Sequence, residues 1–376
     1  MARPAFKKAA KARRPHSKAG PKAGPKPPPE AGPKPPPEAG SKPPPKPAPA
    51  PAERPPRPRY RGARLPETIG VMLERAPSDD FELIDTGNGR KLERYGPLTL
   101  DRPEAQALWQ PSLLPAEWAK ADAVFTGDTD EEGAGRWQFA GPAKETWPLA
   151  HATKQGSVAY HGRFTAFRHV GVFPEQAPHW AEMVRLIREA GRPSSEPVRV
   201  LNLFGYSGLA SLLAGAAGAA VTHVDASRKA IGWARENAGV AGLEDAPIRW
   251  ICDDAVKFCE REVRRGRTYD VVLLDPPAFG RGPKGEVWQF FDDVPHLVDL
   301  ARQLASERPL LTVLTSYAIR ASHVAIHELM QECFGDLDGR LESGELILRD
   351  RAGRALSTSM FSRFLGAQAE PVEKKR

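Results

Sequence analysis

Cysteine is scarce in this chain, and long apolar runs are missing. Three Cys in 376 residues are too few, and odd in number, for a disulfide scaffold, and they point to a reducing compartment. No apolar segment of a secretory signal is visible. Residues 200–224 carry no Asp, Glu, Lys or Arg, but Asn202, Ser207, His223 and several glycines interrupt them. We therefore expect a cytoplasmic protein without a membrane span.

Acidic residues are rare in the N-terminal segment. Residues 1–60 contain 15 Lys or Arg, three Glu and 20 Pro, and residues 23–46 repeat AGPKPPPE with a period of eight. Proline removes backbone donors, so we expect a disordered basic tail. The other 316 residues have 39 Lys or Arg against 44 Asp or Glu, which excludes a uniformly basic DNA-coating protein. Three interpretations of the tail stay open: a linker, an arm that binds RNA phosphates, or a targeting segment.

Residues 61–173 predict a small β-rich domain. FELIDTG and RKLERYG flank Asn88-Gly89, a pair typical of two-residue hairpin turns. Further short strand-like segments follow, namely RWQFAG, GSVAYHG and RFTAFRHVGVF. This region indicates a sheet but no chemistry.

Strands and helices alternate over residues 174–368. Apolar strands are expected at 198–204, 220–225, 247–253, 269–275 and 309–316, with two closing strands at 341–348 and 356–364. Helices are expected at 175–191, 209–217, 227–238, 255–264, 288–305 and 323–333. The alternation predicts an α/β fold, with a mostly parallel sheet covered by helices on both faces. Residues 369–376 are expected to form a flexible C-terminus.

Four of these strands end in groups that suit a nucleotide-like ligand. The loop FGYSG (204–208) lacks the G-x-G-x-x-G dinucleotide fingerprint and suits a smaller charge, such as an amino-acid carboxylate. Asp225 can accept hydrogen bonds from ribose hydroxyls, and Asp254 can accept one from an adenine amine. Either aspartate can instead serve the N-terminus of a helix. Asp275-Pro276-Pro277 ends the fourth strand, so the combination is more specific than any single member.

The segments VLNLFGYSG, VDAS, DDA and LLDPPAF resemble class I S-adenosylmethionine-dependent methyltransferases, in particular the large-subunit (23S) rRNA methyltransferases. HVGVFPEQ (169–176) resembles the segment that leads into their catalytic domain. The resemblance implies a Rossmann-like catalytic domain, S-adenosylmethionine as cofactor and RNA as partner. The cofactor site that it implies consists of Gln176, Asn202, Phe204, Gly205, Tyr206, Ser207, Gly208, Asp225, Ala226, Ser227, Asn237, Asp253, Asp254 and Ala255.

The predicted catalytic residues follow the fourth strand: Asp275, Pro276, Pro277 and Phe279. Methyl transfer from a sulfonium is an in-line displacement, in which positioning supplies much of the rate. A rigid Pro-Pro turn would fix the directions of the Asp275 carboxylate and the Pro276 carbonyl, which can accept hydrogen bonds from a base amine. Phe279 can stack on that base.

The predicted substrate contacts lie on either side of the next helix. The loop at 280–288 is basic and glycine-rich, so Arg281 and Lys284 can bind phosphates and Trp288 can stack on a base. Ser316 ends the following strand and completes the set. A mobile surface loop with a core Trp is the alternative interpretation of 280–288.

The placement of cysteine separates two kinds of base methylation. Methylation at pyrimidine C5 needs a thiolate nucleophile, and residues 275–286 contain no Cys. Cys252, Cys259 and Cys333 are expected to pack as small hydrophobic residues. Attack by a heteroatom, such as a guanine nitrogen, fits better. The histidines show no metal-ligand spacing, so no metal is expected.

The sequence therefore predicts an S-adenosylmethionine-dependent methyltransferase that acts on RNA, in particular on a base of large-subunit rRNA. Two alternatives stay open. The acceptor can be a protein or a small molecule, in line with the acidic folded part. The chain can also be an inactive, cofactor-binding RNA-assembly factor, although the intact Asp275-Pro-Pro motif argues against this.

Overall fold

The computed structural model describes residues 57–127, 135–317 and 319–369, apart from positions 59, 61, 143 and 155. The chain divides into two units, Met1–Arg54 and Pro55–Arg376, and all described residues belong to the second. The predicted disordered tail therefore lies outside the described residues except for Arg57, Pro58 and Tyr60, and the predicted flexible C-terminus (369–376) does so except for Ala369.

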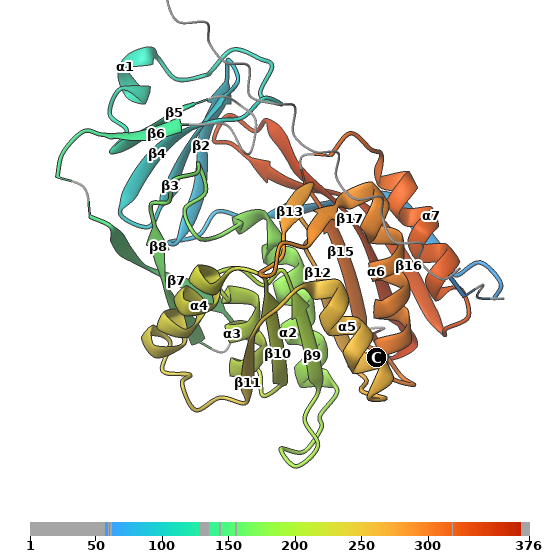
Figure 1. Ribbon diagram of the computed structural model, residues 1–376. Coiled ribbons are helices and arrows are strands. Elements are labelled where there is room, and N and C mark those ends of the chain that lie inside the picture. Colours follow the sequence, from blue (N-terminus) through green and yellow to red (C-terminus); the bar gives the residue numbers. More distant parts are fainter. Residues whose placement is uncertain are drawn as a thin grey trace, which may run out of the picture. The chain divides into compact units, whose positions relative to one another are not determined.

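An eight-stranded sheet is the largest sheet among the described residues, with the strand order β1-β16-β17-β15-β12-β9-β10-β11 (Figure 1). All its neighbours pair in parallel except β17, which is antiparallel to both β15 and β16. This confirms the predicted mostly parallel sheet. Its strands are β1 (Glu67–Arg75), β9 (Arg199–Leu203), β10 (Ala220–Asp225), β11 (Ile248–Cys252), β12 (Val271–Leu274), β15 (Leu311–Ser316), β16 (Gly339–Arg349) and β17 (Ala355–Gly366).

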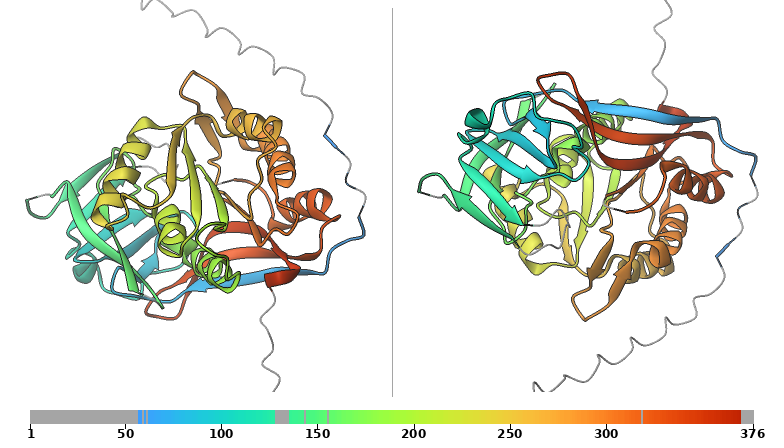
Figure 2. Two further views of the ribbon diagram at one scale, coloured as in Figure 1. Left: turned by 90° about the horizontal axis from the view of Figure 1, so that it is seen from below. Right: turned by 90° about the horizontal axis from the view of Figure 1, so that it is seen from above.

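Helices cover both faces of this sheet (Figure 2). Along β9 the side chains alternate: Val200 belongs to the core under α2 and α3, whereas Leu201 and Leu203 belong to the core under α5, α6 and α7. The helices are α2 (Ala177–Glu189), α3 (Leu209–Ala216), α4 (Arg228–Val240), α5 (Ala255–Arg264), α6 (Phe290–Leu304) and α7 (His323–Phe334), with short 3-10 turns η1 (Pro174–Gln176) and η2 (Ala367–Ala369). Among the described residues, no helix is both long and apolar enough to cross a bilayer.

The β-rich region builds two smaller sheets. One has five strands: β2 (Phe81–Gly87), β3 (Arg90–Tyr95), β4 (Leu98–Pro103), β5 (Ala123–Gly127) and β6 (Gly135–Phe139). The other is the hairpin of β7 (Thr146–Thr153) and β8 (Gly156–Arg163), and α1 (Pro115–Trp118) is a single turn. Asn88 and Gly89 have φ of 52° and 73°, which confirms the predicted two-residue turn between β2 and β3.

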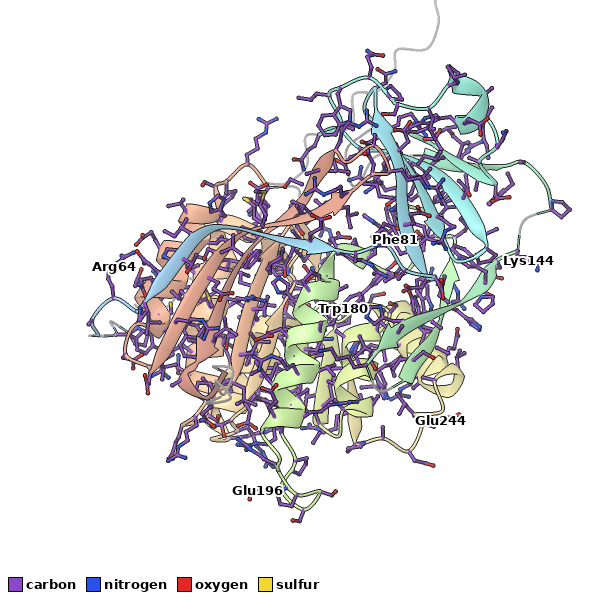
Figure 3. The ribbon with its side chains drawn as sticks, turned by 180° about the vertical axis from the view of Figure 1, so that it is seen from behind. Arg64, Phe81, Lys144, Trp180, Glu196 and Glu244 are labelled. Atoms are coloured by element: carbon purple, nitrogen blue, oxygen red, sulfur yellow. The ribbon has the colours of Figure 1, made fainter. Side chains whose placement is uncertain are left out.

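The predicted boundary at residue 174 is wrong for β1. Glu67–Arg75 was assigned to the β-rich domain, but it pairs in parallel with β16, from Glu67 opposite Leu341 to Arg75 opposite Leu348. In Figure 3, β1 runs from near Arg64 along the edge of the large sheet toward the β-rich region, where Phe81 begins β2. The large sheet therefore uses the chain on both sides of the β-rich region.

The loop predicted at 280–288 is a short hairpin. β13 (Phe279–Arg281) pairs with β14 (Val287–Gln289), so Trp288 lies in a strand and α6 begins after it. The segment is rich in glycine and does not show the alternating pattern that predicts strands. Pro295 lies inside α6, which is one helix from Phe290 to Leu304.

Candidate functional site

Two adjoining hollows lie where the carboxyl ends of β9, β10, β11, β12 and β15 meet. The inner hollow is lined by His179, Asn202, Gly205 and Thr315 among others and has a cavity volume of about 70 Å³. The outer hollow is lined by Asp225, Asp254, Pro277 and Phe279 among others, with about 420 Å³. Side chains that line both hollows are Phe173, Gln176, Phe204, Tyr206 and Asp275. The strand ends thus form one continuous site with a narrow and a wide part.

The loop after β9 holds an unusual backbone. Phe204 and Tyr206 have φ of 57° and 51°, a conformation that costs free energy for residues with a side chain. A Cβ on Gly205 would come within 2.3 Å of the His223 ring, so only glycine fits there. Gly208 has φ of 89° and precedes α3 as its N-cap. The chain maintains strain at this position, which is typical of ligand-binding loops.

Asp225 ties this loop to the end of β10. Its carboxylate accepts hydrogen bonds from the backbone N–H of Tyr206 at 2.9 Å and of Ser227 at 2.7 Å. A carboxylate offers about four acceptor sites, so Asp225 can still accept hydrogen bonds from hydroxyl groups of a ligand in the outer hollow. Burial raises the pKa of Asp225, and the two N–H donors only partly oppose this. Ser227 caps α4, as predicted, by accepting from the Ala230 N–H.

Two further carboxylates follow β11. Asp254 caps α5 by accepting from the Lys257 N–H at 2.9 Å, and burial raises its pKa. Asp253 forms an ion pair with Arg261 and accepts from the Asp254 N–H. Both residues line the outer hollow. The helix-capping alternative for Asp254 is therefore correct, and it is compatible with a ligand contact.

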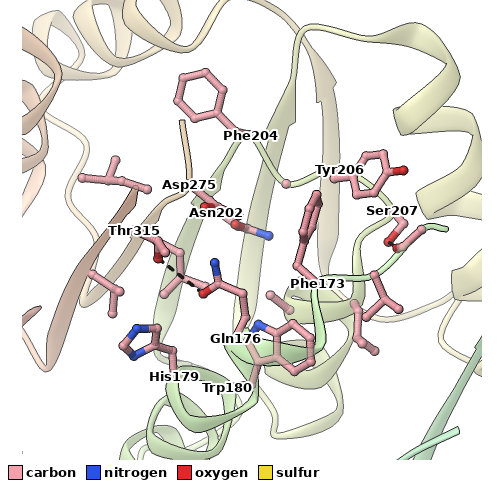
Figure 4. A pocket seen from close by; sticks show the side chains of 18 residues that line it. Phe173, Gln176, His179, Trp180, Asn202, Phe204, Tyr206, Ser207, Asp275 and Thr315 are labelled. Atoms are coloured by element: carbon pink, nitrogen blue, oxygen red, sulfur yellow. Dashed lines mark hydrogen bonds between the residues drawn. The ribbon is translucent and has the colours of Figure 1, made fainter. Parts of the chain in front are cut away.

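Asp275 lies where the two hollows join, directly after β12 (Figure 4). The turn that follows it is held from the β13–β14 hairpin, because the indole Nε1 of Trp288 donates to the Pro277 carbonyl at 2.7 Å. Phe279, which opens that hairpin, is 41% exposed in the outer hollow, and the Arg281 guanidinium lies 5.9 Å from its ring centroid. An acidic group thus faces both parts of the site, beside an exposed aromatic ring.

A solved structure decides the family. The chain is 54% identical to a protein described as the SAM-dependent methyltransferase from Agrobacterium tumefaciens, with a TM-score of 0.77 over 82% of this chain and 97% of that one. The chain belongs to the S-adenosylmethionine-dependent methyltransferases. Their cofactor is S-adenosylmethionine, as the resemblance implied.

Other relatives of this methyltransferase match only parts of it. The family model described as "Conserved hypothetical protein 95" matches residues 186–283. The ribosomal RNA large subunit methyltransferase K/L of Desulfotalea psychrophila is 29% identical over 53% of this chain and 26% of its own length. The ribosomal RNA large subunit methyltransferase I of Shewanella denitrificans is 41% identical over 21% of this chain and 20% of its own. The chain thus spans about a quarter or less of these curated relatives.

The cofactor's shape can be tested against the site. The carboxylates of Asp225, Asp254 and Asp275 come from three strand ends into one hollow, beside a loop whose backbone leaves no room for a Cβ at Gly205. Acceptors for hydroxyl and amine donors, next to a tight backbone loop, fit a nucleoside with a charged tail. Within the described part of the chain, no group of three or more His, Cys, Asp or Glu could hold a metal ion.

Most predicted site residues of the methyltransferase lie in these hollows. The inner hollow contains Asn202, Gly205 and Ser207, and both contain Gln176, Phe204, Tyr206 and Asp275. The outer hollow contains Asp225, Ala226, Ser227, Asp253, Asp254, Ala255, Pro276, Pro277, Phe279, Arg281 and Trp288. These residues come from segments between Gln176 and Trp288, and the parallel sheet brings those segments together.

Asn237 and Gly208 support the site from behind without lining it. The Asn237 amide donates to the Ser207 carbonyl at 2.9 Å and accepts from the His161 N–H at 3.0 Å. Asn237 is fully buried in α4, so it links the loop to β8 rather than facing a ligand. Asn237 lines neither hollow, and its predicted contact with the cofactor stays a prediction.

Three predicted substrate contacts have little or no surface in the hollows. Lys284 lies in the exposed turn between β13 and β14 and lines neither hollow. Ser316 is 0% exposed, because it points to the face of β15 opposite Thr315. Trp288 is 5% exposed and packs edge-on against Phe204 at 5.2 Å, so its ring is not open to a base. Alternation along a strand explains the error at Ser316.

Several site residues were missed in the sequence. Thr315 lies one position before Ser316 and donates to the Gln176 Oε1 at 3.3 Å. Phe167 lines the outer hollow and is 52% exposed, and Tyr317 and Glu175 line it too. Glu175 and Tyr317 adjoin predicted residues, so proximity could have found them. Phe167 carries no such signal.

Proposed function

We propose that this methyltransferase transfers the methyl group of S-adenosylmethionine to a heteroatom of an RNA base, in large-subunit rRNA. The observation that carries the proposal is the position of Asp275, whose side chain lines both hollows. A group there can contact the acceptor in the outer hollow while it lies beside the place of transfer. The Rossmann-like sheet and the family support the cofactor side of this assignment.

Each hollow contains some of the residues that would hold the cofactor. Asp225 and Asp254 in the outer hollow would accept from ribose hydroxyls and the adenine amine, and the loop Phe204–Gly208 would enclose the amino-acid end. When bound, the cofactor supplies an electrophilic methyl group on a positively charged sulfur. The chain's own task is then to align an acceptor with that methyl group.

Asp275 and the Pro-Pro turn would orient the acceptor. A carboxylate that accepts a hydrogen bond from a base amine fixes the direction of the amine lone pair. The bond from Trp288 to the Pro277 carbonyl holds the turn, and this leaves the Pro276 carbonyl as the second acceptor that we assign to the base. Phe279, exposed in the same hollow, would stack on the base plane.

The cysteines favour a heteroatom over a carbon acceptor. Cys259 lies on α5 and Cys333 on α7, both are buried in the core, and burial raises the pKa of Cys333 to about 12. Cys252 lies at the end of β11, and its Sγ contacts the Ala226 carbonyl at 3.5 Å. None of the three, which are all described, lines either hollow. A thiolate that adds to a pyrimidine ring is therefore not supplied, whereas a nitrogen acceptor needs none.

RNA as the acceptor rests on two supports. Two relatives are named ribosomal RNA large subunit methyltransferases. In addition, the outer hollow contains exposed phenyl rings at Phe167 and Phe279 and a guanidinium at Arg281, the groups that stack on and neutralise single-stranded RNA.

The test is transfer to defined RNA by the full chain. Ribosomal RNA from cells that lack this protein would be incubated with the protein and methyl-labelled cofactor, and its nucleosides analysed by mass spectrometry. We expect one N- or O-methylated nucleoside that wild-type cells also contain. If label enters protein or small molecules but not RNA, the acceptor is not RNA and the proposal is wrong on this point. If the cofactor binds but no methyl group is transferred, the chain is an inactive assembly factor.

A further inference from the structure

A tyrosine directly after β15 lies beside the turn to which we assign catalysis. β15 pairs in parallel with β12, and Leu314 lies opposite Leu274. Tyr317 and Pro277 each follow three positions later, and both line the outer hollow. Because parallel strands keep their register up to the edge of the sheet, Tyr317 is a neighbour of the Asp275-Pro-Pro turn across one strand spacing.

The order of the strands places this tyrosine away from the proposed cofactor contacts. The sheet runs β15-β12-β9-β10-β11 across the site. Asp225 ends β10 and Asp254 follows β11, so both lie on one side of β12, whereas Tyr317 lies on the other side. Because the nucleoside contacts that we propose are at β10 and β11, the β15 side of the outer hollow is left for the acceptor.

An arginine from the loop after β8 holds the Tyr317 side chain. The Arg168 guanidinium donates to the Tyr317 hydroxyl at 2.5 Å, and its central carbon lies 5.9 Å from the tyrosine ring centroid. Arg168 is buried, so water weakens this contact little. Hydrogen bonds in a chain polarise one another, so a phenol that accepts from a guanidinium donates more strongly through its own O–H.

Arg168 is itself anchored in the five-stranded sheet. Its guanidinium also donates to the Pro103 carbonyl at 3.2 Å, at the end of β4, and its backbone carbonyl accepts from the Arg102 guanidinium at 2.9 Å. Arg102 is held in turn by two hydrogen bonds to the buried Glu93 carboxylate on β3, at 2.7 and 2.9 Å. A line of buried charged groups therefore connects β3 and β4 to a side chain in the acceptor part of the site.

We propose that the Tyr317 hydroxyl donates a hydrogen bond to the acceptor base, and that Arg168 is the positioning residue that aims it. The inference rests on the function proposed above, which places a base in the outer hollow. A base that carries an amine meets both contacts, with the amine toward Asp275 and a ring nitrogen or carbonyl oxygen toward Tyr317. The β-rich region thereby sets the direction of a base contact.

Tyr317→Phe tests the base contact, because it removes the hydroxyl and keeps the ring. Transfer by the full chain to ribosomal RNA from cells that lack this protein would be measured at varied RNA and saturating cofactor. We expect kcat/KM for RNA to fall about tenfold, the scale of one hydrogen bond. The affinity for S-adenosylhomocysteine, measured by calorimetry, should stay within about twofold. A wild-type kcat/KM in Tyr317→Phe would overturn the base contact.

Tyr60→Phe is the matched control. Tyr60 is also partly exposed, its hydroxyl is hydrogen-bonded, and the Arg302 guanidinium lies 5.1 Å from its ring centroid, but it lines neither hollow. This variant should keep the wild-type kcat/KM for RNA and the wild-type affinity for S-adenosylhomocysteine. A tenfold loss of kcat/KM in both variants would overturn the base contact, because loss of any such hydroxyl would then have the same effect.

A double variant tests the positioning role of Arg168. Arg168→Lys keeps the charge but loses the planar group that donates to both Pro103 and Tyr317. It should lower kcat/KM for RNA about tenfold without changing the affinity for S-adenosylhomocysteine, and the addition of Tyr317→Phe should lower kcat/KM no further. Losses that multiply would overturn the positioning role, because Arg168 would then act independently of the hydroxyl. If the wild-type chain methylates no RNA, the proposed function itself fails, and this inference with it.

Discussion

The indole Nε1 of Trp288 donates to the backbone carbonyl of Pro277 at 2.7 Å, and this bond joins the β13–β14 hairpin to the turn after β12. Trp288 was expected to stack on a substrate base. It is instead buried, and its polar atom faces the Asp275-Pro-Pro turn. A hairpin that also packs against Phe204 of the loop after β9 thereby holds the turn to which we assign catalysis.

Trp288→Phe should therefore weaken catalysis more than binding. The substitution keeps an aromatic ring against Phe204 but leaves the Pro277 carbonyl without its donor. We expect kcat to fall about tenfold, since displacement rates depend steeply on alignment, while the Kd for the cofactor changes less than about threefold. Trp147→Phe is the control, because the buried Trp147 indole also donates to a carbonyl, that of Tyr95, outside both hollows. It should lower stability and leave kcat unchanged.

Asp275→Asn should separate chemistry from cofactor binding. The amide keeps the shape of the side chain but loses the charge and one acceptor, so the acceptor base would be poorly oriented. We expect a loss of about 100-fold or more in transfer, with calorimetric cofactor affinity retained within about fivefold. Asp253→Asn is the comparison, because Asp253 lines the same hollow but is paired with Arg261. Transfer at the wild-type rate by Asp275→Asn would refute the proposed role of Asp275.

Much of this site could be predicted from the sequence. Each strand and helix that was predicted over residues 174–368 ends within two residues of its observed bounds. Buried parallel strands are continuous apolar runs, and residues such as Ser227 mark the helix starts. Because parallel strands end at a common edge of the sheet, the sequence alone predicts that Asp225, Asp254 and Asp275 lie close together.

Several of the errors come from strand pairing that the local sequence does not indicate. β1 joins β16 across more than 260 residues, and nothing local in Glu67–Arg75 indicates that partner. Trp288 was misread because burial by a hairpin depends on the pairing of Phe279 with Gln289. Phe167 reaches the outer hollow from the loop after β8, and its exposure is known only once the hollow exists.

Cofactor affinity should fall in acid at a higher pH than for a surface aspartate. Burial raises the pKa of Asp225, and the ionised carboxylate is the form that accepts from ribose hydroxyls. Affinity is therefore full above this raised pKa and is lost as the pH falls through it. The effect on stability has the opposite sign. Because the pKa of Asp225 is higher in the folded chain than in the unfolded chain, the ionised carboxylate destabilises the fold. The free energy of unfolding therefore falls as the pH rises from the unfolded pKa to the folded pKa.

Asp225→Asn checks this assignment. The amide has one oxygen for the N–H groups of Tyr206 and Ser227, so we expect cofactor affinity to drop by about tenfold or more. The decrease of cofactor affinity at low pH, measured by calorimetry, should also become smaller. Burial raises the pKa of Asp254 too, so Asp254→Asn is measured in parallel. A pH dependence that persists unchanged in Asp225→Asn but disappears in Asp254→Asn would move the titration to Asp254.

Cys252→Ala should leave transfer to RNA within about twofold of wild type. Cys252 is the partly exposed cysteine, next to Ala226 in the cofactor site, while Cys259 and Cys333 are buried. A heteroatom acceptor needs no thiolate, and the alanine fills most of the same space. Rates would be measured with saturating cofactor. A loss of several hundredfold with cofactor binding intact would restore a covalent route through this thiol.

Removal of the N-terminal tail should weaken RNA binding in a salt-dependent way. The structure sets the cut: Arg57 pairs with Glu332, and the Tyr60 hydroxyl donates to Asp299 at 2.9 Å, so both residues should be kept. Residues 1–54 carry 13 Lys or Arg and three Glu. If several of these cations neutralise phosphates, deletion of 1–54 will reduce the slope of log K against log salt by about 0.7 per lost contact. A full-length variant with the lysines and arginines of residues 1–54 changed to glutamine should match the deletion. An unchanged slope in both would identify the tail as a linker.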